Sequence, residues 1–234
     1  MTAVLLGLGW VTPGGMGAAR NAGGFALGGG ELPEIERRDI FNDAYQRFGR
    51  LDRFSRLGLA AITFALRDAR LEEWQEKRAI GIIASTRLGC LVTDIDYFDG
   101  VIPEQGRLAS PNLFAYTLPN CFLGEAAIRF GLTGSNFIVS GRAGDPLLSL
   151  RLGLESLAWG EEEIVVVGCC DLDAPPALAD FAGEDPGAVF AVLARSSADG
   201  YGTISTDGAD GVRFNDIPLE GWSELVWTAL SSCS

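Results

Sequence analysis

The sequence predicts a layered α/β fold: a mixed, mostly parallel sheet flanked by helices. Short, continuous apolar runs have the length of strands that are buried on both faces. Segments with helical periodicity lie between most of these runs, and such alternation is typical of α/β proteins. With 234 residues, the chain is also long enough to bury a substantial core.

Five apolar runs are the candidates for buried strands. They cover residues 4–8, 79–84, 137–139, 164–168 and 188–193. Directly after the fourth run come Cys169 and Cys170, whose side chains point to opposite faces if the strand continues. We therefore expect these two thiols to fill space in the core rather than to react.

Four segments have the apolar spacing of helices. They cover residues 51–69, 119–130, 146–159 and 222–230. In the third, Asp145 is the expected N-cap, Pro146 the first helical residue and Gly160 the stop signal. The apolar face of the fourth is expected to dock on the chain's own domain, with a partner protein as the alternative.

Composition changes beyond Ser196, where Asp-Gly pairs recur and indicate turns. We therefore expect a compact domain over residues 1–198. Residues 199–234 are expected to form a Gly/Asp-rich connector and a carboxy-terminal amphipathic helix.

Charge and hydropathy exclude several classes of protein. A net charge of −13 disfavours nucleic-acid binding, because phosphates need a basic face. No apolar run is long enough to cross a membrane, and the amino terminus lacks the features of a signal peptide, so we expect a cytoplasmic protein. One basic cluster, Arg47, Arg50, Arg53 and Arg56, could attract an acidic partner, although a solvated helix face is the simpler interpretation.

No metal or cofactor is predicted. The five cysteines form no Cys-x-x-Cys pair and the chain has no histidine, which argues against a zinc site. The opening Gly7-Leu-Gly9 resembles a dinucleotide-binding loop, but Thr12 stands where the third glycine belongs. A strand that leaves through a tight turn explains these glycines more simply.

The segment 136–160 is the most informative one for function. An apolar strand enters a turn of small residues, and a helix follows. Acyl-transfer enzymes place a Ser or Cys nucleophile at the apex of such an elbow, where backbone N–H groups and the helix N-terminus favour negative charge. Here the apex residue is Arg142, whose guanidinium stays protonated and cannot attack a thioester.

Several blocks in fixed order carry a resemblance to a known family. They are residues 4–13, 51–61, 81–89, 110–111, 118–120, 127–134 and 160–168. The most specific are Asp52-Arg-Phe-Ser-Arg56 and Ile128-Arg-Phe-Gly-Leu-Thr-Gly134. Over residues 4–194 the chain resembles the amino-terminal half of the β-ketoacyl-acyl-carrier-protein synthases, the condensing enzymes of the thiolase superfamily.

Two departures limit what the resemblance implies. The family's elbow reads approximately Thr-Ala-Cys-x-Ser-Gly, whereas this chain has Ser140-Gly-Arg-Ala-Gly-Asp145. The family's two histidines belong to a carboxy-terminal half, and this sequence stops before such a half begins. The catalytic residues are therefore not carried over.

The resemblance implies a thiolase-like half-fold that pairs through the strand ending in the elbow. It also implies a ligand-binding pocket, whose candidate residues are Ser110, Phe114, Thr117, Leu118, Arg142, Ala143, Gly144 and Asp145. Two roles for Arg142 stay open. It is either an inert plug, paired with Asp145 or another carboxylate, or a group that binds a carboxylate or phosphate.

The leading functional hypothesis is a non-catalytic synthase-like protein that partners an active ketosynthase in fatty-acid or polyketide-type biosynthesis, as chain-length-factor subunits do. One alternative is a homodimer that binds an acyl chain or an acyl carrier protein. Another is an acyltransferase that uses Cys90 or Cys121, or a partner's residues, in a shared site. A helix N-terminus next to Cys90 could lower the pKa of its thiol, although a structural thiol is the simpler interpretation for both cysteines.

Overall fold

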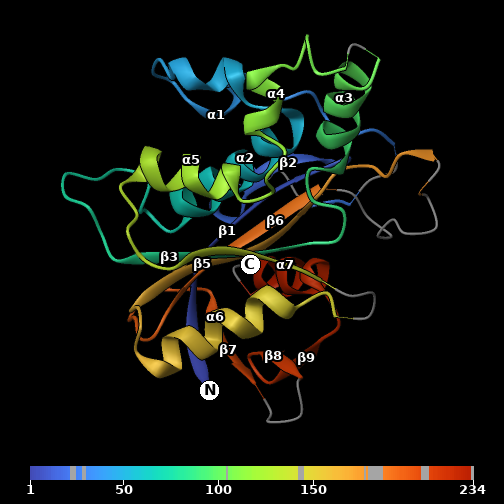
Figure 1. Ribbon diagram of the computed structural model, residues 1–234. Coiled ribbons are helices and arrows are strands. Elements are labelled where there is room, and N and C mark those ends of the chain that lie inside the picture. The colour runs from blue at the N-terminus through green and yellow to red at the C-terminus, as the bar shows by residue number, and fades with distance from the viewer. Residues whose placement is uncertain are drawn as a thin grey trace.

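A nine-stranded mixed sheet forms the middle layer of the protein, with helices on both faces (Figure 1). The computed structural model describes residues 1–21, 25–27, 30–103, 105–141, 145–176, 178, 187–206 and 211–232. Within these residues the strand order is β4-β3-β5-β6-β1-β7-β8-β9, and β2 pairs with β1. The predicted layered α/β fold is confirmed.

The predicted apolar runs are all strands. The strands are β1 (Thr2–Thr12), β2 (Gly15–Ala18), β3 (Ile80–Thr86), β4 (Asn136–Ser140), β5 (Ile164–Asp171), β6 (Gly187–Ala194), β7 (Gly202–Thr206), β8 (Val212–Phe214) and β9 (Ile217–Leu219). The helices are α1 (Arg37–Ile40), α2 (Arg53–Asp68), α3 (Leu91–Val101), α4 (Pro111–Ala115), α5 (Cys121–Phe130), α6 (Leu148–Trp159) and α7 (Trp222–Ser231). Two 3-10 turns, η1 (Ala19–Asn21) and η2 (Gln46–Arg50), complete the described elements.

Parallel pairing is confined to one end of the sheet. β3 runs parallel to both β4 and β5, whereas β6 is antiparallel to β5 and to β1. The pairs that involve β2, β7, β8 and β9 are antiparallel as well. The sheet is mixed, as expected, but its parallel part is smaller than expected. The sequence does not reveal this, because a strand buried on both faces has a continuous apolar run whether it pairs in parallel or antiparallel.

One face of the sheet is covered by α2 and α5 (Figure 1). α2 lies so close to β1 that a Cβ at Gly9 would come within 2.2 Å of the Ala65 backbone nitrogen. A Cβ at Gly7 would come within 2.5 Å of the backbone nitrogen of Ala69, the residue that follows α2. The chain leaves β1 through a tight turn at Pro13 and Gly14, as expected, but Gly7 and Gly9 lie inside the strand, where close helix packing and not the turn explains them.

The opposite face is covered by α6 and α7 (Figure 1). In α7 the buried side chains are Trp222, Leu225, Val226 and Ala229, so this helix docks on the chain's own sheet. Both α5 and α6 end at a glycine in the left-handed conformation, Gly131 and Gly160, as the stop signals predict.

The segment beyond residue 198 contributes strands as well as turns. We expected a connector there, but β7 pairs with β1, and β8 and β9 extend the same sheet. The turn between β8 and β9 contains Asn215 and Asp216, both with positive φ, which is typical of a two-residue hairpin. These strands are short, and none contains a continuous apolar run like those that predicted the other strands. The division of the chain at residue 198 stays a prediction.

Among the described residues, none of the helices combines the length and apolar character that crossing a membrane requires.

Candidate functional site at the elbow

β3, β4 and β5 are parallel, so their carboxyl ends lie side by side. β4 ends at Ser140, which pairs with Thr86 at the end of β3. The next residue, Gly141, donates its backbone N–H to the Thr86 carbonyl oxygen over 2.8 Å. The predicted apex, Arg142, and its neighbours Ala143 and Gly144 lie outside the described residues.

Asp171, the last residue of β5, holds the chain that follows β3. Its Oδ1 accepts hydrogen bonds from the Thr86 hydroxyl (2.8 Å) and from the backbone N–H groups of Arg87 (2.8 Å) and Leu88 (3.1 Å). The Thr86 hydroxyl oxygen in turn accepts from the Gly89 N–H over 2.8 Å. Burial raises the pKa of Asp171 despite these donors. Thr86 thus connects two segments. Its carbonyl oxygen binds Gly141 at the end of β4, and its hydroxyl group binds Asp171 at the end of β5.

Sequence analysis missed this role of Asp171. The available signal was a carboxylate at the end of a buried apolar strand, in Cys170-Asp171-Leu172. Its hydrogen-bond donors come from residues more than eighty positions away, so the sequence alone does not reveal them.

The helix after the elbow begins later than predicted. α6 starts at Leu148, and its N-cap residue, Leu147, makes no side-chain capping bond. The prediction of Asp145 as the N-cap is wrong, because its carboxylate forms a bidentate ion pair with Arg151, at 2.6 and 2.5 Å. If Arg142 is a plug paired with Asp145, it has to share that carboxylate with Arg151.

The first turn of α6 is anchored to the sheet by Ser149. Its buried hydroxyl donates to the Gly168 carbonyl oxygen over 2.7 Å and lies 3.2 Å from the Ser85 hydroxyl. Ser85 precedes Thr86 in β3, so α6 and the elbow are fixed to adjacent residues of one strand. Both sides of residues 142–144 are therefore tied to β3.

The other candidate pocket residues lie in α4 and the turn after it. Ser110 caps α4 by accepting the Leu113 N–H over 3.3 Å, and the Thr117 hydroxyl donates to the Phe114 carbonyl oxygen over 2.8 Å. The side chains of Phe114 and Leu118 are 61% and 60% exposed. Among the described residues, no hydrogen bond or ring contact joins these four to Ser140, Gly141 or Asp145. Their assignment to a ligand pocket stays a prediction.

The described cysteines are not activated. Burial, together with the nearby Asp94 carboxylate, raises the pKa of Cys90 to about 12, so the start of α3 does not lower it and the favoured interpretation of a structural thiol is the one that fits. Burial also raises the pKa of Cys121, which lies at the start of α5. In β5, Cys170 and Cys169 pack into the cores on opposite faces of the sheet, and burial raises the pKa of each.

The basic cluster is partly engaged within the chain. Arg47 forms a bidentate ion pair with Glu125, at 2.6 and 2.8 Å. Arg53 donates to the Leu32 carbonyl oxygen, and Arg56 donates to the Leu51 carbonyl oxygen. Within the described part of the chain, no cluster of acidic or cysteine side chains has the arrangement of a metal site.

The layered mixed sheet of the described residues has the fold of the thiolase-like α/β proteins. The family described as "Beta-ketoacyl synthase, N-terminal domain" matches residues 28–212. The chain therefore belongs to the β-ketoacyl synthase family, as the resemblance of its motifs implied.

The chain is similar to 3-oxoacyl-[acyl-carrier-protein] synthase 2 of Vibrio cholerae, with 27% identity over 128 residues. The match covers 54% of this chain and 31% of that protein, so the chain spans about a third of this curated relative.

Two solved structures share the fold. The ishigamide ketosynthase/chain length factor matches with a TM-score of 0.65 and 19% identity, over 85% of this chain and 63% of that one. The ketosynthase ApeO in complex with its chain length factor ApeC, from Xenorhabdus doucetiae, matches with a TM-score of 0.60 and 18% identity. That match covers 85% of this chain and 81% of the other, so the two chains are similar in length.

Proposed function

We propose that this chain is a non-catalytic β-ketoacyl-synthase-like subunit that pairs with an active synthase in fatty-acid or polyketide-type biosynthesis. The observation that carries the proposal is Arg142 at the apex position of the elbow, in a member of a condensing-enzyme family. A guanidinium cannot accept an acyl group, and the chain contains no histidine to serve as a base. An acyl carrier protein is a further proposed partner.

The residues around the elbow and the described cysteines are consistent with a protein that keeps the family's architecture and lacks a nucleophile. Hydrogen bonds of Thr86, Asp171 and Ser149 anchor the residues on both sides of positions 142–144 to the sheet. The raised pKa values of Cys90 and Cys121 argue against a substitute nucleophile in the described part of the chain. Similarity to structures of ketosynthases with chain length factors supports a paired role.

The edge strand β4 is the proposed pairing surface. Gly141 donates to Thr86, and Ser135 accepts from Ile82, so the odd-numbered residues of this segment face β3. The backbone groups of the even-numbered residues therefore point outward, and they belong to Asn136, Ile138 and Ser140. The opposite edge of the sheet, β9, is only three residues long and contains Pro218. β4 has no such protection and offers its edge to a partner strand.

The test is complex formation with an active synthase encoded by a neighbouring gene. We expect a stable complex by size-exclusion chromatography with light scattering, and a changed product length relative to the synthase alone. Ile138→Pro removes an outward N–H while the bonds to β3 remain, so it should abolish the complex. Phe137→Arg, in the same strand, should weaken it strongly, and the control Ile217→Arg, at the opposite edge, should not.

Two results would contradict the proposal. One is the absence of any complex with the unmodified chain. The other is covalent loading of the chain alone by an acyl thioester, detected by intact-mass spectrometry. If the chain alone forms a symmetric dimer that binds an acyl ligand, and Arg142→Ala abolishes that binding, the homodimeric binding module replaces the proposal.

A further inference from the structure

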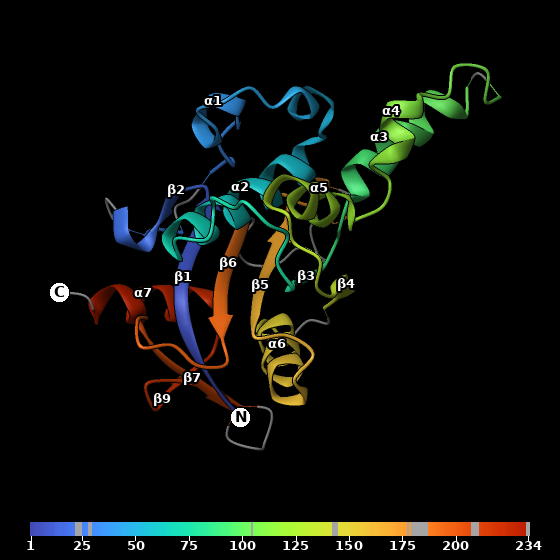
Figure 2. The same cartoon turned by 90° about the vertical axis from the view of Figure 1, so that its left-hand side faces the viewer.

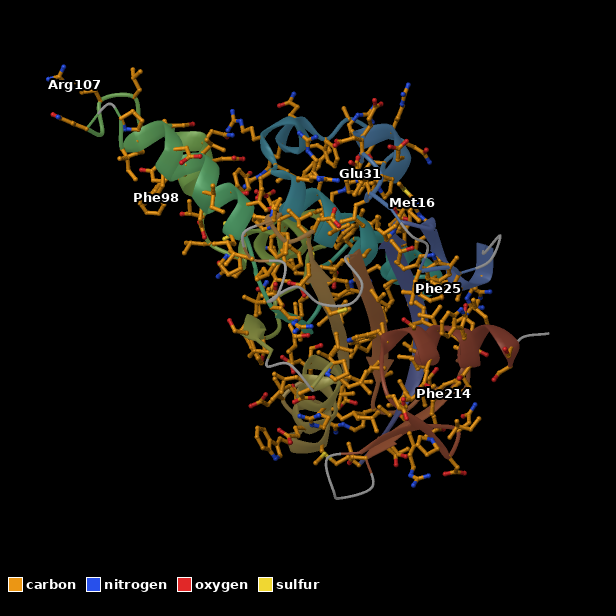
Figure 3. The ribbon with its side chains drawn as sticks, turned by 90° about the vertical axis from the view of Figure 1, so that its right-hand side faces the viewer. Met16, Phe25, Glu31, Phe98, Arg107 and Phe214 are labelled. Atoms are coloured by element: carbon orange, nitrogen blue, oxygen red, sulfur yellow. The ribbon has the colours of Figure 1, made fainter. Side chains whose placement is uncertain are left out.

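An arm formed by α3, α4 and the described residues between them projects from the body of the protein (Figures 2 and 3). One side of α3 faces α4, where the Tyr97 and Phe114 rings lie 5.6 Å apart. The other side exposes Ile95, Phe98 and Ile102, which share a face at i, i+3 and i+7. Phe98 is 55% exposed and Ile102 is 69% exposed. We call these three residues the apolar stripe of the arm.

Carboxylates accompany the apolar stripe. Asp96 and Asp99 are exposed, and no ion pair of the described residues involves either of them. They stand three residues apart on one helix, where like charges repel. Asp99 also lies in the last turn of α3, where the helix dipole disfavours a negative charge. The remaining charges of the arm include the Asp94 carboxylate near the base and Arg107 near the tip (Figure 3).

These features are unfavourable in the isolated chain. An exposed apolar stripe, repelling carboxylates and a carboxylate at a helix C-terminus each raise the free energy of the folded arm. A partner that buries the stripe and places cations beside Asp96 and Asp99 removes all three penalties. The arm extends on the side of the molecule where β4 lies, so a subunit that pairs with β4 is placed to reach it (Figure 2).

We propose that the arm docks into an apolar groove with a basic rim on the partner synthase, and that its carboxylates select this partner over a second copy of the chain. The inference rests on the proposed function and identifies the contact that decides the choice of partner. A second copy carries the same −13 charge and the same acidic arm, so close approach of two copies is electrostatically unfavourable.

The test measures the affinity of the chain for the synthase at 50, 150 and 500 mM salt by biolayer interferometry. We expect Asp96→Lys/Asp99→Lys to lower the affinity about tenfold or more at low salt and to flatten its salt dependence. Phe98→Asp should lower it about tenfold or more at every salt concentration. The control Glu31→Lys/Glu34→Lys changes two exposed carboxylates at the same spacing on the body, away from the arm, and should have less than a threefold effect (Figure 3).

The outcomes separate the two proposals. If the unmodified chain binds no synthase, the proposed function fails. If the synthase binds and both arm variants bind as tightly as the unmodified chain, only the role of the arm is overturned. A third outcome would also overturn the role of the arm. If the unmodified chain self-associates and Phe98→Asp abolishes this self-association, the arm binds a second copy of the chain. Circular dichroism spectra of the variants check that each has folded.

Discussion

Individual residues next to the elbow are positioned by partners that lie both far away and nearby in the sequence. Thr86 receives the Gly141 N–H on its carbonyl oxygen and gives its own hydroxyl hydrogen to Asp171. Asp145 is held by Arg151 at the start of α6. The described residues on either side of positions 142–144 are thus held by hydrogen bonds and by an ion pair.

Loss of the Asp171 carboxylate should destabilise the protein. Asp171→Ala removes the acceptor of three hydrogen bonds and leaves two backbone N–H groups without it. We expect the free energy of unfolding to fall by about 2–4 kcal/mol, and by about 1 kcal/mol in Asp171→Asn, which keeps an acceptor oxygen. Urea denaturation measures both values. Equal stability of Asp171→Ala and the unmodified chain would show that Asp171 does not hold the loop after β3.

At the scale of elements, the packing of α2 against β1 determines how the sheet is covered. Two glycines in β1 let the helix backbone approach the strand more closely than any other residue would permit. The same helix carries buried side chains along most of its length, so its position is set by the core rather than by its ends. An extra methyl group at this contact has no space to enter.

Gly9→Ala should therefore be among the most damaging single-methyl changes in the chain. Its Cβ would lie 2.2 Å from the Ala65 nitrogen and 2.5 Å from the Ala61 carbonyl oxygen, both backbone atoms that move only with the helix. We expect a loss of about 3 kcal/mol in the free energy of unfolding. The control Gly124→Ala adds a methyl group in α5 with nothing within 4 Å, and it should be neutral or stabilising by up to about 1 kcal/mol. A Gly9→Ala protein as stable as the control would contradict the close approach.

At the scale of the whole molecule, one continuous sheet joins both parts of the chain. β7 pairs with β1, and α7 packs with side chains from β1 and β8 in a common core. That core contains Leu5, Phe214 and Leu225, which come from opposite ends of the sequence. The strands and the helix beyond residue 198 therefore contribute to the same sheet and core as the strands before it.

This continuity predicts a single unfolding transition. Urea curves followed by tryptophan fluorescence and by far-UV circular dichroism should coincide, because Trp10 and Trp222 lie in one core cluster. Leu225→Ala removes a fully buried side chain of α7 and should shift the whole curve, by about 2–5 kcal/mol. A separate early transition that alone responds to Leu225→Ala would mean that residues 199–234 form a domain of their own.

The sequence by itself determined the buried strands, the helices 51–69 and 119–130, the family resemblance and the absence of a nucleophile at residue 142. These depend on local patterns or on the chemistry of one side chain, and a guanidinium stays charged in any fold. Only the tertiary structure decided the partner of Asp145, the role of Asp171, the exposure of Phe98 and the strands β7–β9. Each of these depends on which residues meet in space, because hydrogen-bond partners, burial and the pairing of short strands are properties of spatial neighbours.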